Sequence, residues 1–210
     1  MKLHTFPPSP NSRKVMVVAE HLGIPLDVVP IDLTKGEQRD PKFLAINPNG
    51  MIPTLVDGDF VLWESNAIMQ YLAETKPGNT LWPADARSRA DIARWLFWDQ
   101  GHWMSACGTL LWENFVKGLL KMGAPDPAAV KLGEEKFAKF GAVLDTHLAK
   151  NDYLACGRFT LADIAVAPYF GYADGGRFPM GSFAGIKRWL ARLDSIPAWQ
   201  KTAPQLGRAA

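Results

Sequence analysis

At 210 residues, the chain is long enough for one large or two small domains with a full hydrophobic core. Apolar residues make up 48% of it and charged residues 21%, which is ordinary for a soluble globular protein. The net charge of +2 gives no case for a nucleic-acid surface, no apolar run reaches membrane-spanning length, and Pro7 and Pro8 come too early for a signal peptide. Two cysteines, Cys107 and Cys156, cannot form a disulfide framework, so we expect a cytoplasmic protein with both thiols in the core.

The first third of the chain alternates between strand and helix patterns. In chain order, the predicted elements are a strand at 2–6, a helix from about 12 to 22, a strand at 26–31, a short helix at 41–45, strands at 54–56 and 60–63, and a helix that begins at 64–65. Helices between strands favour a mainly parallel sheet, but the two-residue turn between the last two strands makes that pair antiparallel. We therefore predict a thioredoxin-like α/β domain over residues 1–77, without a redox Cys-x-x-Cys motif.

The strand pattern disappears from residue 84 on. Apolar residues at helical spacing predict helices at 86–101, 104–120, 128–148, 157–175 and 182–193. Residues 84–210 should therefore form an all-α domain. Five of the eight tryptophans lie between residues 82 and 112, which suggests an aromatic cleft or a subunit interface, with core packing as the alternative.

Thr160 and Asp163 have the spacing of a helix capping box, and Phe159 and Ile164 have that of a hydrophobic staple. The alternative role for Asp163 is that of a catalytic acid. Because the capping box accounts for both polar residues without chemistry, we expect Asp163 to be structural.

Residues 47–55 contain two prolines and a glycine within seven positions, which predicts a sharply bent loop. Pro53 is a candidate for a cis peptide bond, which would leave the backbone N–H and C=O of Ile52 free to pair with an extended peptide. The helix that begins at Ser65 has unpaired N–H groups that suit a carboxylate. Together these two features predict a site for a short acidic peptide.

The loop, the hairpin and the pair Glu64-Ser65, in this order and spacing, resemble the glutathione-binding half of the glutathione transferase family. The classes with a catalytic Tyr or Cys are disfavoured, because Phe6 lacks a hydroxyl and no Cys precedes Cys107. Residues 9–15 resemble most the bacterial nu-class and related Ser/Thr/Asn-type enzymes, as do residues 36–39, 47–49, 63–65 and 95–98. The resemblance covers nearly the whole chain. It implies a homodimer active in detoxification, with glutathione as co-substrate and no metal.

In such an enzyme the glutathione thiol must be ionised, yet a free thiol has a pKa of about 8.5. The resemblance implies that Ser9 and Asn11, at the start of the first helix, contact the sulfur and hold it as a thiolate. The alternative is that Ser9, Asn11 and Ser12 only cap this helix, since Ser and Asn are preferred caps. The peptide site downstream favours the sulfur-binding role.

The resemblance also implies where the rest of the tripeptide binds. Ile52, through its backbone and beside a cis Pro53, would pair with the cysteinyl unit, while Glu64 would hold the γ-glutamyl ammonium and Ser65 the γ-glutamyl carboxylate. Gln38 would contact the glycyl end, or else it is a solvated loop residue.

One departure from the nu-class pattern concerns the glycyl carboxylate. Met51 stands where those sequences often have Lys or Arg, so a cation is missing unless Arg39 or Lys35 replaces it. For the second substrate, Trp98, His102 and Trp103 are candidates for an apolar wall, although a lone His among aromatics is more often structural.

The predicted reaction is attack of a glutathione thiolate on an electrophilic carbon, a hydroperoxide or a disulfide, the last two being typical of the nu class. A different class of function is a transferase-fold binding protein with little turnover, which carries apolar ligands or serves as a dimeric interaction module. A cis–trans isomerase of the maleylacetoacetate type is a third hypothesis, and it matches the sequence less well.

Overall fold

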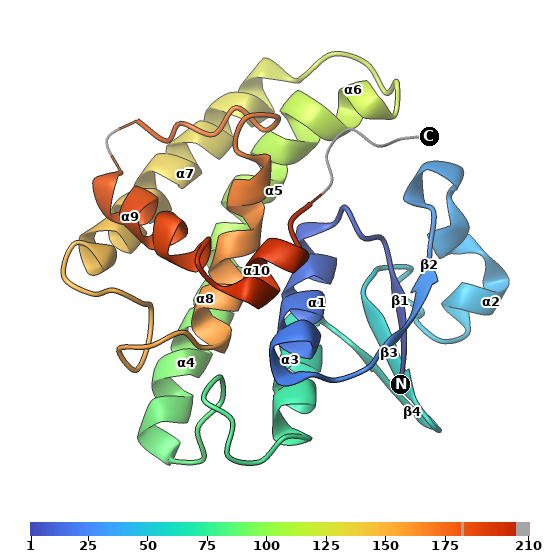
Figure 1. The fold of residues 1–210 in the computed structure, drawn as a ribbon. Helices are drawn as coiled ribbons and strands as arrows, with labels where there is room; N and C mark the ends of the chain where they lie inside the picture. Colours follow the sequence, from blue (N-terminus) through green and yellow to red (C-terminus); the bar gives the residue numbers. More distant parts are fainter. Residues whose placement is uncertain (182, 205–210) are drawn as a thin grey trace. The chain divides into compact units, whose positions relative to one another are not determined.

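The structure is a computed structural model that describes residues 1–181 and 183–204 (Figure 1). It divides into two compact units. The first consists of Met1–Trp82 together with the described residues from Ile196 on, and the second is Pro83–Ser195. The predicted helical domain, 84–210, therefore differs at its end, because the last helix packs within the first unit.

A four-stranded sheet forms the centre of the first unit. Its strands are β1 (Lys2–Thr5), β2 (Asp27–Pro30), β3 (Thr54–Asp57) and β4 (Phe60–Trp63), in the order β2-β1-β3-β4. β1 is parallel to β2 and antiparallel to β3, which is antiparallel to β4. The predicted thioredoxin-like fold is confirmed, but the expectation of a mainly parallel sheet is wrong. The segment between β2 and β3 contains only short helices, and β3 enters the sheet in the opposite direction.

Two helices cover one face of this sheet, α1 (Pro10–Leu22) and α3 (Ser65–Glu74), and they pack against each other (Figure 1). The fully buried side chains between these elements include Leu3, Leu55, Val15, Val18, Ile68 and Leu72. The short helix α2 (Pro41–Leu44) lies beyond the other face, where its Phe43 ring contacts His4 of β1 at 6.0 Å between centroids. Because successive side chains of a strand point to opposite faces of the sheet, β1 contributes to packing on both faces.

The second unit is helical throughout its regular structure. One continuous run comprises α4 (Ala86–Trp98), the π-helical segment η3 (Asp99–Trp103), α5 (Met104–Leu111), the π-helical segment η4 (Trp112–Val116) and α6 (Lys117–Leu119). It is followed by α7 (Pro127–Leu148), α8 (Leu161–Val166), the 3₁₀ segment η5 (Ala167–Tyr172) and α9 (Ala184–Leu193). An aromatic core that includes Trp103, Phe137 and Trp189 joins these helices.

Several predicted boundaries shift for local reasons. The first helix begins at Pro10 rather than residue 12, because proline is well suited to the first helical position. The predicted helix 157–175 is shorter, since Cys156 and Gly157 have positive φ angles and regular α-helix begins only at Leu161. The predicted start of the last long helix, Ser182, lies outside the described residues. The capping box of Thr160 and Asp163 is present as predicted.

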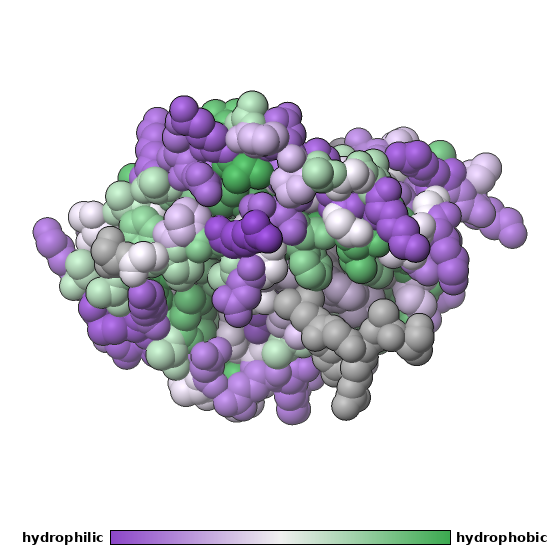
Figure 2. Space-filling model, turned by 90° about the horizontal axis from the view of Figure 1, so that it is seen from above, coloured by the Kyte–Doolittle hydropathy of each residue, from purple (hydrophilic) through white to green (hydrophobic). Residues whose placement is uncertain are grey.

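No described helix combines the length and the apolar character needed to cross a membrane. Figure 2 shows one face of the molecule, on which hydrophilic side chains predominate and hydrophobic ones appear between them.

Candidate functional site

The segments predicted to bind a peptide meet at one edge of the sheet. β1 and β4 are both antiparallel to β3, so they run in the same direction and end at the same edge, where β3 begins. His4, Thr54 and Trp63 form one row of paired residues across this edge. The sheet therefore directs the start of α1, the loop before β3 and the start of α3 to one side of the unit.

The bond between Ile52 and Pro53 is cis, as the sequence predicted. Asn47, which is only 1% exposed, shapes the loop that leads to it. Its side-chain amide donates hydrogen bonds to the Met51 carbonyl at 2.7 Å and to Thr54 Oγ1 at 2.9 Å. This organising role was not predicted, although an Asn that folds back on its own loop is a known signal of such turns.

Ser9 stands at the N-cap of α1 with extended backbone, but its side chain makes no capping hydrogen bond. The alternative role of Ser9 as a side-chain cap is therefore not seen. Its hydroxyl is therefore not used to cap the helix. Ser9 and Asn11 are both half-buried, whereas Ser12 is fully buried. The first turn contains no acidic residue, so its positive dipole potential is not offset locally.

Glu64 precedes α3 in a backbone conformation that is unusual for a residue with a side chain, with φ 72° and ψ 111°. Such a conformation costs on the order of 1–3 kcal/mol and is found mostly at binding and catalytic sites. Its side chain is exposed and makes no capping bond, and the adjacent Ser65 is 6% exposed at the first position of the helix. The start of this ten-residue helix has no side-chain cap from Glu64, and a helix N-terminus of this kind suits a carboxylate.

The short 3₁₀ helix η2 (Glu37–Arg39) lies against the same loop. A Cβ atom on Gly50, which has φ +60°, would come within 3.1 Å of the Gln38 carbonyl oxygen, so this approach requires glycine. The side-chain oxygen of Gln38 is buried and has no hydrogen-bond partner among the described residues. This geometry suits a ligand contact better than a solvated loop residue.

Lys35 and Arg39 are the two cations predicted near the glycyl carboxylate, and they differ in whether they form an ion pair. Lys35 Nζ lies 3.2 Å from Asp32 Oδ2, so its charge already has a partner. Arg39 is exposed and forms no ion pair within the part of the chain that the structure describes. Met51 is 67% exposed and supplies no charge.

The predicted second-substrate residues belong to the helical unit, in α4 and η3. Trp98 is half-buried and stacks on Trp103 at 5.7 Å between centroids, and the exposed His102 stacks on Phe140 at 4.8 Å. Trp103 is 0% exposed and donates its ring N–H to the Val166 carbonyl at 3.1 Å. Trp103 is therefore a core residue that presents no surface to a substrate, and we do not retain it as a contact.

The structure is that of a two-unit protein, with a candidate site for an extended acidic peptide at this edge of the sheet. Comparison with known proteins identifies the family. Residues 1–74 match the family model described as glutathione S-transferase, N-terminal domain, and residues 127–199 match the model for its C-terminal domain. The chain belongs to the glutathione S-transferase family.

Individual relatives span almost the whole chain. Glutathione S-transferase 3 of Zea mays is 41% identical over 209 residues, which cover 96% of this chain and 92% of that protein. Glutathione S-transferase D7 of Drosophila melanogaster is 34% identical, over 98% and 90%. A theta-class enzyme of Xanthomonas axonopodis pv. citri, solved with glutathione bound, superposes with a TM-score of 0.87 at 29% identity, over 98% and 97%. These relatives confirm the predicted enzyme class but do not specifically support the nu-class subtype.

Proposed function

We propose that the chain binds reduced glutathione at the sheet edge and holds its sulfur as a thiolate for attack on a second substrate. One observation carries the proposal. Three features lie at the same edge of one sheet: the Ser9 hydroxyl, which makes no capping hydrogen bond, the cis Ile52–Pro53 bond, and the N-terminus of α3. They offer a sulfur contact, an extended-backbone contact and a carboxylate contact in the order that the tripeptide requires.

In this proposal the sulfur lies at the start of α1. The Ser9 hydroxyl and the Asn11 side-chain amide donate hydrogen bonds to the thiolate, and the helix dipole stabilises its charge. Both effects favour the ionised form and lower the thiol pKa toward neutrality. The thiolate is the nucleophile, so these donors raise the reactive fraction at neutral pH.

The remaining contacts fix the peptide's position. Ile52 pairs through its backbone with the cysteinyl unit, Glu64 binds the γ-glutamyl ammonium, and Ser65 with the first N–H groups of α3 binds the γ-glutamyl carboxylate. Gln38 contacts the glycyl end. Of the two cations considered for the glycyl carboxylate, we favour Arg39, because Lys35 is already paired with Asp32.

The second substrate is an apolar electrophile, a hydroperoxide or a disulfide, with Trp98 and His102 as its contacts in the helical unit. Disulfide reduction and peroxidase activity are finer proposals than transferase activity, and they rest on the resemblance of residues 9–15 to nu-class enzymes. We further propose a homodimer in the cytoplasm, where reduced glutathione is abundant.

Steady-state kinetics of three alanine variants test the site. Ser9→Ala and Asn11→Ala should lower kcat about 10- to 100-fold, since each removes a hydrogen bond to a charged atom. Ser65→Ala should mainly raise the KM for glutathione, by about ten-fold, because it removes a binding contact. Ser195→Ala, at an exposed helix end, is the matched control and should leave both constants unchanged.

Thiolate absorbance of the glutathione complex provides an independent reading. The wild-type protein should show thiolate at neutral pH, and Ser9→Ala should shift its appearance to higher pH. Unchanged kinetics in all three variants would refute the site. Calorimetry that detects binding of an apolar dye but no binding of glutathione would favour the carrier function instead.

A further inference from the structure

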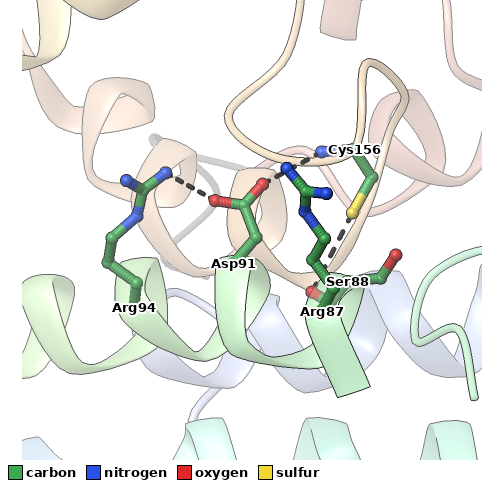
Figure 3. A pocket seen from close by; sticks show the side chains of 5 residues that line it. All are labelled: Arg87, Ser88, Asp91, Arg94 and Cys156. Carbon is green, nitrogen blue, oxygen red and sulfur yellow. Dashed lines mark hydrogen bonds and ion pairs between the residues drawn. The ribbon is translucent and has the colours of Figure 1, made fainter. Parts of the chain in front are cut away.

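A cavity of about 500 Å³ opens in the helical unit, and its lining includes no residue of the proposed glutathione site (Figure 3). Its lining consists of Arg87, Ser88, Asp91 and Arg94 from the first three turns of α4, and Cys156 from the turn before α8. Cys156 was expected in the core, but it is only partly buried, whereas Cys107 is fully buried. The volume lies within the range of small-ligand pockets, about 300–1,000 Å³.

A tight turn presents the Cys156 thiol to this cavity. Ala155 and Arg158 form an isolated antiparallel bridge, and the two residues between them, Cys156 and Gly157, have φ angles of 58° and 62°. This is the pattern of a type I′ turn, in which Asn or Gly usually occupies both central positions. The Cys156 N–H donates to Asp91 Oδ2 at 3.3 Å, while its Sγ is only loosely held, 3.9 Å from the Ser88 carbonyl (Figure 3).

The charges around the thiol are predominantly positive. Arg94 pairs with Asp91 Oδ1 at 2.5 Å, so both carboxylate oxygens of Asp91 are engaged, one by Arg94 and one by the Cys156 N–H. The Arg87 guanidinium forms no ion pair or hydrogen bond with any residue that the structure describes, and it remains exposed at the cavity. A cavity with an unpaired guanidinium beside a second one favours a ligand with carboxylates.

We propose that this cavity captures small disulfides that carry carboxylates, and that Cys156 then exchanges with them to form a mixed disulfide. Arg87, whose guanidinium is unpaired, binds one carboxylate, and the N–H groups of Arg94 that do not contact Asp91 bind the other, which places the ligand's S–S bond beside Sγ. Cys156 loses its proton to solvent, and its thiolate attacks one ligand sulfur. The S–S bond breaks, a new Sγ–S bond forms, and the departing thiolate takes up a proton. Cys156 is oxidised in this step, and half of the ligand is reduced to a thiol.

The inference is independent of the proposed transferase site. All five lining residues belong to the helical unit, and none of them contacts glutathione in the proposed reaction. Ser65→Ala should therefore weaken glutathione binding in the first unit and leave the exchange rate at Cys156 unchanged. The two proposals can fail separately.

Exchange kinetics with disulfides of opposite charge test the inference on the full-length protein. Glutathione disulfide is the acidic probe, cystamine is the cationic one, and mass spectrometry of peptides locates the adduct. The adduct should form on Cys156 and not on Cys107. The ratio of the two rate constants should favour glutathione disulfide, and Arg87→Gln combined with Arg94→Gln should lower that ratio about ten-fold.

Matched variants separate a local effect from a general one. Lys131→Gln removes one exposed positive charge from α7, outside the cavity, and should leave the ratio unchanged. Cys156→Asn removes the thiol and keeps a residue that tolerates positive φ, so the protein should fold and form no adduct. The inference is overturned by an adduct on Cys107 alone, by no adduct at Cys156, or by a ratio that the arginine substitutions do not change.

Discussion

At the scale of single residues, Asp163 shows how one buried carboxyl joins separate segments of the helical unit. Its oxygens accept hydrogen bonds from the Leu154 N–H at 3.0 Å, the Thr160 N–H at 2.9 Å and the Trp189 ring N–H at 2.9 Å. The sequence predicted the bond to Thr160, because capping boxes are local. The bonds to Leu154 and Trp189 connect residues that only the tertiary fold brings together.

The same carboxyl gives a pH dependence with a defined sign. Burial raises the pKa of Asp163 from 3.8 to about 6, and the hydrogen bonds it accepts offset only part of that rise. Because the folded state then binds the proton more tightly than the unfolded state, this group stabilises the fold below pH 3.8, and that contribution is lost as pH rises through 6. Between pH 5 and 7 the loss should be on the order of 1 kcal/mol.

Urea unfolding of wild type and Asp163→Asn at pH 5 and pH 7 measures this contribution. Asparagine does not titrate, so the variant lacks the pH-dependent contribution of the carboxyl. The difference in free energy of unfolding between wild type and variant should therefore narrow as pH rises. The variant should be less stable at both pH values, since the asparagine NH₂ cannot accept the bond from Thr160. A gap that widens with pH would mean that the hydrogen bonds, not burial, set the pKa of this carboxyl.

At the scale of elements, the short helix α10 (Pro197–Lys201) is held by one buried cation of α1. Arg13 is 4% exposed, donates from Nη2 to the Trp199 carbonyl at 3.0 Å, and places its guanidinium carbon 3.6 Å from the centroid of the Trp199 ring. Trp199→Ala removes the ring from a buried site, and we expect it to cost about 3–5 kcal/mol. Lys201→Gln breaks only the exposed pair with Glu20 and should change stability by less than about 0.5 kcal/mol.

Unfolding in urea and limited proteolysis together check this prediction. Trp199→Ala should lower the unfolding midpoint and expose the segment after residue 195 to cleavage, while Lys201→Gln should resemble wild type in both assays. Equal effects of the two substitutions would show that the contact between Arg13 and the Trp199 ring does not hold α10 in place.

Elements were predictable from the sequence in proportion to their length and regularity. α1 and α7 have enough turns to show apolar periodicity, and both were expected near their observed bounds. α10 has five residues, too few for a period, so it was not predicted. The direction of β3 depends on where the chain re-enters the sheet, and no local pattern in the sequence encodes that.

At the scale of the whole molecule, the sequence located the candidate site better than it described it. The cis bond at Pro53 and the helix start at Ser65 follow from proline chemistry and from helix-start signals. The hydrogen bonds of Asn47 and the positive φ of Glu64 arise from packing, and a residue pattern shows neither. Trp103 is 0% exposed, and the tryptophan cluster in the sequence did not distinguish an aromatic cleft from core packing.

Formation of the proposed homodimer should depend on Phe97. This side chain of α4 is 78% exposed, more than any other large hydrophobic residue described. Burying such an apolar side chain against a second copy of the chain would remove it from water. Light scattering should give about twice the 23.2 kDa of one chain, and Phe97→Glu should raise the dimer dissociation constant at least about ten-fold. Val143→Glu, at a 50% exposed position of α7, is the control and should leave the dimer intact. A monomeric wild type, or equal behaviour of the two variants, would show that α4 is not the contact.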